Sequence, residues 1–130
     1  ENGRLHRTLR TELPDLTVIR TTSPLDHQSI WYEIFPPAIS KANAAAWVCE
    51  HYRIDKHTAL AIGNDYNDLD LLHWGSFSRV VANAPPDLQR QFVVVSDHNN
   101  NGFAEAIADW RQIISTQSTN HSPKQTALDE

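Results

Sequence analysis

Apolar positions along the chain recur with two spacings, one typical of strands and one typical of helices. Residues 17–22 are rich in β-branched side chains and residues 29–35 in β-branched and aromatic ones, so both segments predict strands. The turn residues of 23–27 lie between them, which predicts an antiparallel hairpin. Pro36 and Pro37 end the second strand, because proline cannot donate to a sheet ladder.

Helical patterns precede and follow this hairpin. A short helix is predicted at about residues 4–12, and Pro14 stops it. Ser40 has the side chain of an N-cap for a helix from Lys41 to about His51. Further along, strands alternate with helices, which predicts a parallel sheet. These later elements are a strand at 58–62, a helix that begins near 69, a strand at 79–82, a helix at 87–91, a strand at 92–95 and a helix at 102–114.

The composition is that of an ordinary globular protein, with 40% apolar and 21% charged residues in 130. A net charge of −5 argues against a nucleic-acid backbone or an anionic membrane as the main partner. The sequence also has no run approaching the roughly 18 apolar residues of a membrane helix. We therefore expect neither a nucleic-acid nor a membrane partner.

The numbers of cysteine and methionine residues bear on the compartment of the protein and on the extent of this sequence. Cys49 is the single cysteine, so no internal disulfide can form, which favours a reducing compartment such as the cytoplasm and a packing role for this thiol. The sequence has no methionine and cannot contain its own initiator. We expect it to be the tail of a longer polypeptide.

The segment that carries chemistry follows the strand at 58–62, with the sequence Gly-Asn-Asp-Tyr-Asn-Asp at 63–68. In α/β proteins the carboxyl ends of buried parallel strands carry the active site. The carboxylate and amide oxygens gathered here are ligands that Mg²⁺ favours. An EF-hand calcium loop is excluded, because the glycine at its sixth position and the closing glutamate are both missing.

Lys41 at a helix start, and the Gly-Asn-Asp-Tyr-Asn-Asp loop about twenty residues later, together resemble the haloacid dehalogenase superfamily. The similarity is to the C-terminal part of the Cof-type sugar-phosphate phosphatases, which have a lysine at a helix start and then Gly-Asp-x-x-Asn-Asp. It covers roughly residues 29–114, and the segments 81–84 and 99–102 also look like later parts of that family.

The resemblance implies an α/β fold: the C-terminal half of a Rossmann-like parallel-sheet core, preceded by the last β-hairpin of an α/β cap. Residues 1–37 would end the cap, residues 38–114 would belong to the core, and residues 115–130 would form a disordered tail, because they are polar with almost no large apolar side chain. It also implies a Mg²⁺ cofactor and a phospho-aspartate formed on an Asp-x-Asp motif of the first core strand. We expect this chain to lack that motif altogether, so the nucleophile would lie outside the chain and the fragment alone would be inactive.

The resemblance also assigns roles to matching residues. Lys41 would orient the substrate phosphoryl group and neutralise its charge, since phosphoryl transfer concentrates negative charge. Asn67 would hold the phosphate or metal-bound waters, and Asp68 would orient Lys41 or contact the metal through water. For Asp70 we expect helix capping rather than metal binding. Asn83 is either a residue at the rim of the site or a turn amide before Pro85.

Asn64 stands where the family usually has its metal-binding aspartate. Three interpretations stay open. Asp65, the next residue, could take over the metal contact through a small change in the loop. Asn64 could contact the metal directly or through water, with lower affinity because an amide brings no charge. Or this branch of the family has weakened or lost catalysis.

We therefore expect the parent protein to be a Mg²⁺-dependent phosphatase of small phosphorylated metabolites. The alternative is a non-catalytic α/β module that binds a ligand or another protein. A severed parallel sheet exposes an edge, so dimerisation through that edge is also expected. Glu33, on the second predicted strand, could face the substrate, while the four tryptophans are expected to serve in packing.

Overall fold

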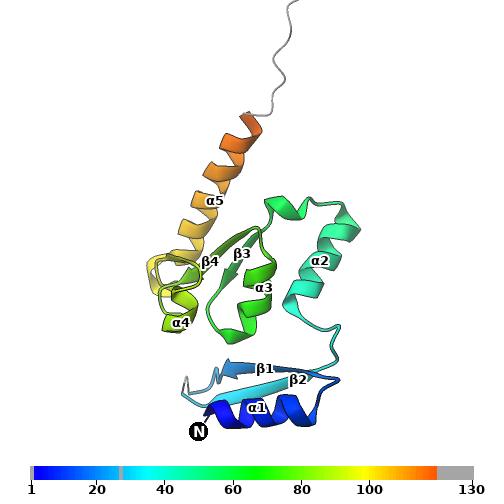
Figure 1. Ribbon diagram of the computed structural model, residues 1–130. Coiled ribbons are helices and arrows are strands. Elements are labelled where there is room, and N and C mark those ends of the chain that lie inside the picture. Colours follow the sequence, from blue (N-terminus) through cyan, green and yellow to red (C-terminus); the bar gives the residue numbers. More distant parts are fainter. Residues whose placement is uncertain (1, 27, 120–130) are drawn as a thin grey trace, which may run out of the picture.

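The computed structural model describes residues 2–26 and 28–119. Its N-terminal part consists of helix α1 (Asn2–Glu12) and an antiparallel hairpin of β1 (Thr17–Thr22) and β2 (Ile30–Phe35) (Figure 1). The helix is tied to the hairpin by His6, whose Nε2 lies 3.1 Å from the carbonyl oxygen of Val18. The predicted helix and hairpin are therefore confirmed.

The rest of the described chain is built on a three-stranded parallel sheet with strand order β3-β4-β5. This confirms the predicted α/β fold with parallel strands. The strands are β3 (Leu60–Gly63), β4 (Phe77–Val81) and β5 (Val93–Val95). The helices are α2 (Lys41–Tyr52), α3 (Leu69–Trp74), α4 (Pro86–Gln89) and α5 (Gly102–Thr119), with 3-10 turns η1 (Lys56–Thr58), η2 (Tyr66–Asp68) and η3 (His98–Asn100).

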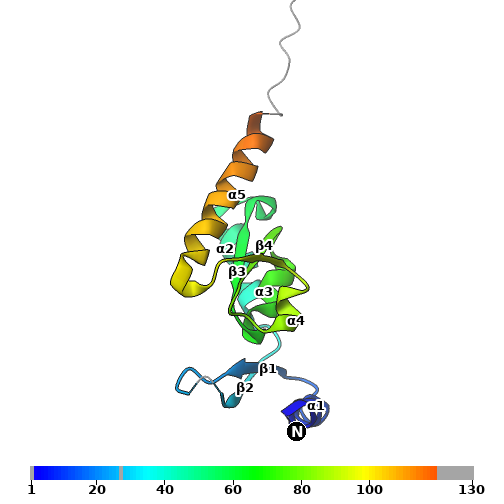
Figure 2. The same ribbon diagram turned by 90° about the vertical axis from the view of Figure 1, so that its left-hand side faces the viewer.

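Helices cover both faces of this sheet (Figure 2). On one face Ala61 and Val80 pack with Leu72 of α3 and Leu88 of α4. On the other face the side chains of β4 and β5 pack against Ala106 of α5. Because side chains alternate across a strand, the apolar run of each strand is used by both layers.

The end of α5 differs from the predicted boundary. We expected a disordered tail from Ser115, but α5 continues to Thr119, so for residues 115–119 that prediction is wrong. The hydroxyls of Ser115 and Thr116 donate to the carbonyl oxygens of Arg111 and Gln112, one turn earlier, so these polar side chains are bonded within the helix. Residues 120–130 of the predicted tail lie outside the described residues.

Two other expectations need adjustment. The strand predicted from residue 58 begins at Leu60, because Asp55 caps the η1 turn by accepting a 2.9 Å hydrogen bond from the backbone of His57. The tryptophans do not all pack inside: Trp31 and Trp47 are 41% and 60% exposed. None of the described helices is both long and apolar enough to cross a bilayer.

The hairpin and the sheet meet at the loop that follows β3 (Figure 1). Arg20 of β1 places its guanidinium 4.7 Å from the ring centre of Tyr66, and the Tyr66 hydroxyl donates a 2.8 Å hydrogen bond to Asp87. Burial is the main cause that raises the pKa of Tyr66, and the hydrogen bond to Asp87 adds to it. These contacts bring the hairpin next to the candidate site.

Candidate active site

Gly63 is the last residue of β3, and the atoms packed around it explain why this residue is a glycine. A Cβ at this position would lie 2.7 Å from Cβ of Asp68 and 2.9 Å from Cδ1 of Leu72. Both distances are shorter than real carbon contacts allow. The glycine therefore lets the loop fold back so that Asp68 lies directly against the end of the strand.

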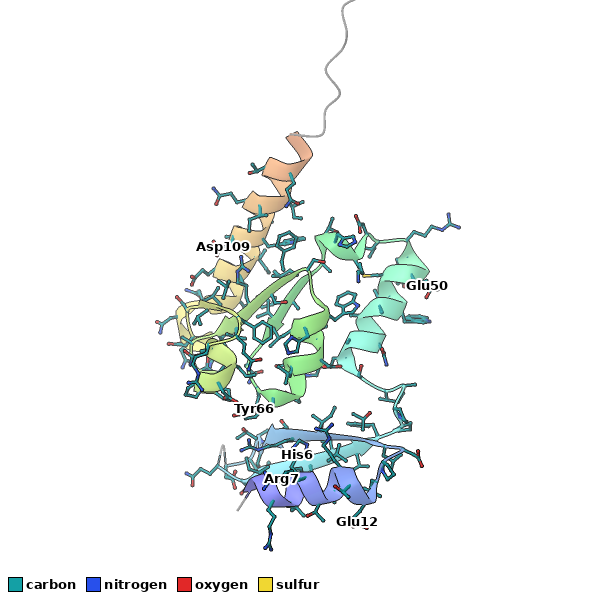
Figure 3. All side chains as sticks on the ribbon, in the orientation of Figure 1. His6, Arg7, Glu12, Glu50, Tyr66 and Asp109 are labelled. Carbon is teal, nitrogen blue, oxygen red and sulfur yellow. The ribbon has the colours of Figure 1, made fainter. Side chains whose placement is uncertain are left out.

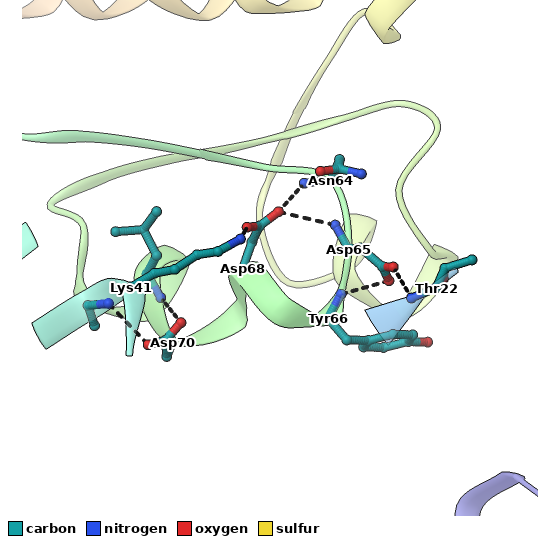
Figure 4. Close-up of polar contacts among 9 residues, drawn as sticks. Thr22, Lys41, Asn64, Asp65, Tyr66, Asp68 and Asp70 are labelled. Carbon is teal, nitrogen blue, oxygen red and sulfur yellow. Dashed lines mark hydrogen bonds and ion pairs between the residues drawn. The ribbon is translucent and has the colours of Figure 1, made fainter. Parts of the chain in front are cut away.

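Asp68 is the residue around which the loop is arranged (Figure 4). Its Oδ2 accepts a 2.8 Å hydrogen bond from the backbone of Asn64 and a longer one, 3.4 Å, from that of Asp65. Its Oδ1 pairs with Nζ of Lys41, at the first residue of α2. The Asp68 side chain is only 9% exposed, and buried charges require such partners.

Lys41 is brought to this carboxylate by the start of its helix. Ser40 caps α2 as predicted, its side chain accepting a 3.0 Å hydrogen bond from the backbone of Asn43. The Lys41 side chain remains 48% exposed although it is paired with Asp68. An ammonium has three donors, so this one can contact Asp68 and an incoming anion together.

Asp65 is buried and fully engaged by backbone donors. Its Oδ2 accepts a 2.7 Å hydrogen bond from the backbone of Thr22 in β1, and its Oδ1 accepts one of 2.7 Å from the backbone of Tyr66. Asp65 and Asp68 also form a reciprocal capping box around the η2 turn. Asn64, by contrast, has an exposed side chain that makes no hydrogen bond with the described residues.

Asp70 makes the capping contacts that we expected of it. Its Oδ2 accepts a 3.1 Å hydrogen bond from the backbone of Ala42 in the first turn of α2, and its Oδ1 accepts one of 2.8 Å from Leu71. Asp68 and Asp70 do have the Asp-x-Asp spacing, but they lie at a helix start and not on a strand. Both carboxylates already accept backbone hydrogen bonds.

Three cavities border the loop, and two of them are lined by Asn64. One, of about 320 Å³, lies between the hairpin and the loop and includes Asn64, Asn67, Trp31 and Glu33 in its lining. The other, of about 410 Å³, shares Asn64 and is also lined by Asn83. A larger cavity of about 530 Å³ lies between β1 and α3, includes Asn67, and touches neither Asn64 nor Asp65.

Asn83 shows features of both interpretations given for it. It borders the 410 Å³ cavity at the rim of the loop, and its Oδ1 also accepts a 3.2 Å hydrogen bond from the backbone of His98. The contact between Thr22 and Asp65 had no sequence signal, because it uses a backbone amide. The sequence likewise did not predict that Trp31 on the hairpin is exposed.

The oxygen donors of the loop fit Mg²⁺, although they are few. Within the described residues no three His, Cys, Asp or Glu side chains come together as a metal-binding group. Asn64, Asp65 and Asp68 nevertheless supply one amide and two carboxylates in consecutive turns of one loop. Mg²⁺ commonly keeps several waters and takes only one or two carboxylates together with substrate phosphate oxygens. These three residues could therefore hold it.

A sequence model of haloacid dehalogenase-like hydrolases matches residues 4–107, most of the chain. The chain belongs to the haloacid dehalogenase-like hydrolases. This membership confirms the superfamily that Lys41 and the loop at 63–68 resemble. The chain spans about a third of the length of the curated relatives it matches, 35%, 29% and 33% of three of them.

The haloacid dehalogenase-like relatives include phosphatases. A phosphoglycolate phosphatase of Methanothermobacter thermautotrophicus is 32% identical over 72 residues, which cover 55% of this chain and 33% of that protein. A subclass IIB sugar phosphatase, BT4131, has a solved structure that matches with a TM-score of 0.71 at 14% identity, over 83% of this chain and 40% of that chain. The sucrose-phosphatase of Synechocystis sp. PCC6803 matches with a TM-score of 0.66 at 19% identity, over 85% and 46%. These structural likenesses confirm the fold.

Proposed function

We propose that the parent protein of this chain is a Mg²⁺-dependent phosphatase of small phosphorylated metabolites. The observation that supports this most directly is the pairing of Lys41 with Asp68. It places the ammonium of a half-exposed lysine side chain beside an oxygen-rich loop at the carboxyl end of β3. A site of this kind can bind a phosphoryl group and meet the charge that its transfer concentrates.

In this proposal each side chain has a separate task. Lys41 contacts the phosphoryl oxygens as a compact point charge, and Asp68 holds the ammonium in place. Asn67 donates hydrogen bonds from its amide to the phosphate. The backbone amides of Asn64 and Asp65 are already engaged by Asp68, which keeps the loop fixed while the substrate binds.

Mg²⁺ held at the loop of Asn64, Asp65 and Asp68 would supply further positive charge for the phosphate. The contacts of the two neighbouring residues favour Asn64 as the one that touches the ion. Its amide is exposed and has no partner among the described residues, whereas both Asp65 oxygens accept backbone hydrogen bonds. An amide brings no charge, so Mg²⁺ affinity should be lower than with an aspartate at this position.

The nucleophile in this proposal is an aspartate outside these 130 residues. Its carboxylate oxygen attacks phosphorus, the bond to the leaving oxygen breaks, and that oxygen takes a proton from solvent water. Water then hydrolyses the phospho-aspartate, which releases phosphate and restores the carboxylate. Residues 1–37 would be the end of the cap, residues 38–114 part of the core, and the location would be cytoplasmic.

The test compares the full-length protein with the 130-residue chain, using p-nitrophenyl phosphate with and without Mg²⁺. We expect turnover only from the full-length protein and only with Mg²⁺, and the chain alone should be inactive. Within the described residues β3 pairs on one side only, with β4, so the chain alone is also expected to dimerise through that edge. A full-length protein that hydrolyses no phosphate ester would instead favour the non-catalytic binding module.

A further inference from the structure

The cavity of about 320 Å³ between the hairpin and the loop is a cleft whose two sides carry different kinds of residue. Its core side carries Asn64 and Asn67, and its hairpin side carries Trp31 and Glu33 of β2. Trp31 and Glu33 are two residues apart on one strand, so their side chains leave the same face of the hairpin. The exposed Trp31 ring and the Glu33 carboxylate therefore face the cleft together.

Three polar side chains in the lining of this cleft lack partners among the described residues. Glu33, Asn64 and Asn67 make no side-chain hydrogen bond or ion pair with the described residues. By contrast, the neighbouring Asp65 and Asp68 are satisfied by backbone amides and by Lys41. Three unpartnered polar groups and one exposed aromatic ring on the walls of one cavity are the arrangement expected of a ligand site.

The position of Lys41 determines which end of a bound substrate lies near the core. Asp68 joins Lys41 to the backbone of Asn64, and Asn64 borders the cleft. Lys41 and Asp68 do not line the cleft themselves, so a phosphoryl group bound to the Lys41 ammonium would lie just beyond the Asn64 end of the cleft, with the departing group extending into it toward β2. Glu33 is the acidic residue that the hairpin contributes to this lining.

We propose that Glu33 is a specificity-determining residue that selects uncharged, hydroxyl-bearing leaving groups and rejects acidic ones. This inference rests on the phosphatase function proposed above. A carboxylate accepts hydrogen bonds from hydroxyl groups, and the Trp31 ring offers an apolar surface to the C–H groups between them. The same carboxylate repels a carboxylate or a second phosphate on the leaving group, and rejection by like charge is an effective source of specificity.

The experiment uses the full-length protein and three substrates: glucose 6-phosphate, phosphoglycolate and acetyl phosphate. Glu33→Gln keeps the shape of the side chain and removes its charge. We expect it to raise the ratio of kcat/KM for phosphoglycolate over glucose 6-phosphate on the order of tenfold. Acetyl phosphate has neither hydroxyls nor a second acid, so its hydrolysis should stay within about twofold.

Two further variants sharpen the result. Glu33→Lys reverses the charge and should move the ratio further in the same direction. Glu50→Gln, on the exposed surface of α2 and away from the cleft, should leave it unchanged (Figure 3). An unchanged ratio in Glu33→Gln, with acetyl phosphate still hydrolysed, would overturn the role of Glu33 alone. A wild-type protein that hydrolyses none of the three substrates would overturn the phosphatase function, and this inference with it.

Discussion

The backbone amide of Thr22 donates a 2.7 Å hydrogen bond to Oδ2 of Asp65, 43 residues later in the chain. The other oxygen of the same carboxylate accepts from the backbone of Tyr66 and so helps to form the η2 turn. One buried side chain therefore joins the hairpin to the loop that carries the candidate site. The position of the hairpin and the shape of the loop depend on each other through this contact.

Asp65→Ala should loosen this junction. Removing the carboxylate leaves the amides of Thr22 and Tyr66 without an acceptor, which should lower the free energy of unfolding by about 2 kcal/mol. Asp65→Asn keeps one acceptor oxygen and should cost less. Urea unfolding of the chain measures both effects, and amide exchange at Thr22 should become faster. Asp109→Ala, at an exposed site on α5, is the control, and unchanged exchange at Thr22 would contradict the prediction (Figure 3).

Lys41→Met should be far more harmful to activity than to folding. The substitution removes the ammonium proposed to meet the phosphoryl charge, so kcat of the full-length protein should fall on the order of 10²- to 10³-fold. Lys41→Arg keeps the charge on a larger planar group and should recover only part of the activity. Lys56→Met, at an exposed lysine in η1, should leave kcat unchanged. Steady-state assays with p-nitrophenyl phosphate decide the matter, and retention of kcat in Lys41→Met would exclude the proposed contact.

Asn64→Asp should strengthen Mg²⁺ binding. A carboxylate in place of the amide adds a negative charge at the proposed ligand, so the Mg²⁺ concentration for half-maximal activity should fall by about tenfold. Asp65→Asn should change this concentration less, because its carboxylate is held by backbone amides. Asn99→Asp, at an exposed residue of η3, controls for charge alone. The opposite ranking of the Asn64 and Asp65 variants would identify Asp65 as the ligand.

Tyr66 should make the stability of the chain depend on alkaline pH. Burial, and then the hydrogen bond to Asp87, raise the pKa of Tyr66, so the folded state holds the phenolic proton more tightly than the unfolded state. This contribution to stability is complete below the unfolded value near pH 10 and is lost as pH rises through the folded pKa.

Tyr66→Phe tests that dependence. The variant lacks the proton and should show a smaller decline in unfolding free energy as the pH rises above about 10. It should also be about 1 kcal/mol less stable near neutral pH, since the hydrogen bond to Asp87 is gone. Urea unfolding at several pH values measures both. Tyr52→Phe, at an exposed tyrosine of α2, should keep the wild-type profile.

Gly63→Ala should disturb the site by a steric clash alone. The added methyl group would meet Asp68 at 2.7 Å and Leu72 at 2.9 Å, so the chain should lose about 1–3 kcal/mol of unfolding free energy as these atoms move apart. Gly3→Ala, in helix α1 with only a 3.4 Å contact to Arg7, should cause no loss of stability. Equal stability of the two variants would show that the loop tolerates the extra carbon.

Much of this architecture was predictable because local chemistry and tertiary structure agree. Residues 17–22 were expected as a strand and form β1, and Ser40 was expected as a cap and caps α2. The alternation of strands and helices predicted the parallel sheet. At the site, the pairing of Lys41 with Asp68 is one of the two roles expected of Asp68, and it joins residues 27 apart in the chain.

Other features depend on contacts that residue types do not encode. The hydrogen bond between Thr22 and Asp65 uses a backbone amide, which any residue at position 22 except proline would offer. The exposure of Trp31 depends on how the hairpin faces the loop, and hydrophobicity alone favours its burial. Helix α5 extends past Ser115 although this segment is polar, and the Ser115 hydroxyl donates to the carbonyl oxygen one turn earlier.

Helix α2 has no buried residue, and within the described chain its charged and backbone bonds to the loop and to α3 come from its first two residues. Lys41 pairs with Asp68, and the amide of Ala42 is bound by Asp70. The amplitude of thermal motion should therefore grow along the helix toward Tyr52 and be smallest at Lys41. The Lys41 ammonium is thereby anchored at the end of α2 nearest the site, and its position does not depend on the C-terminal turns of that helix.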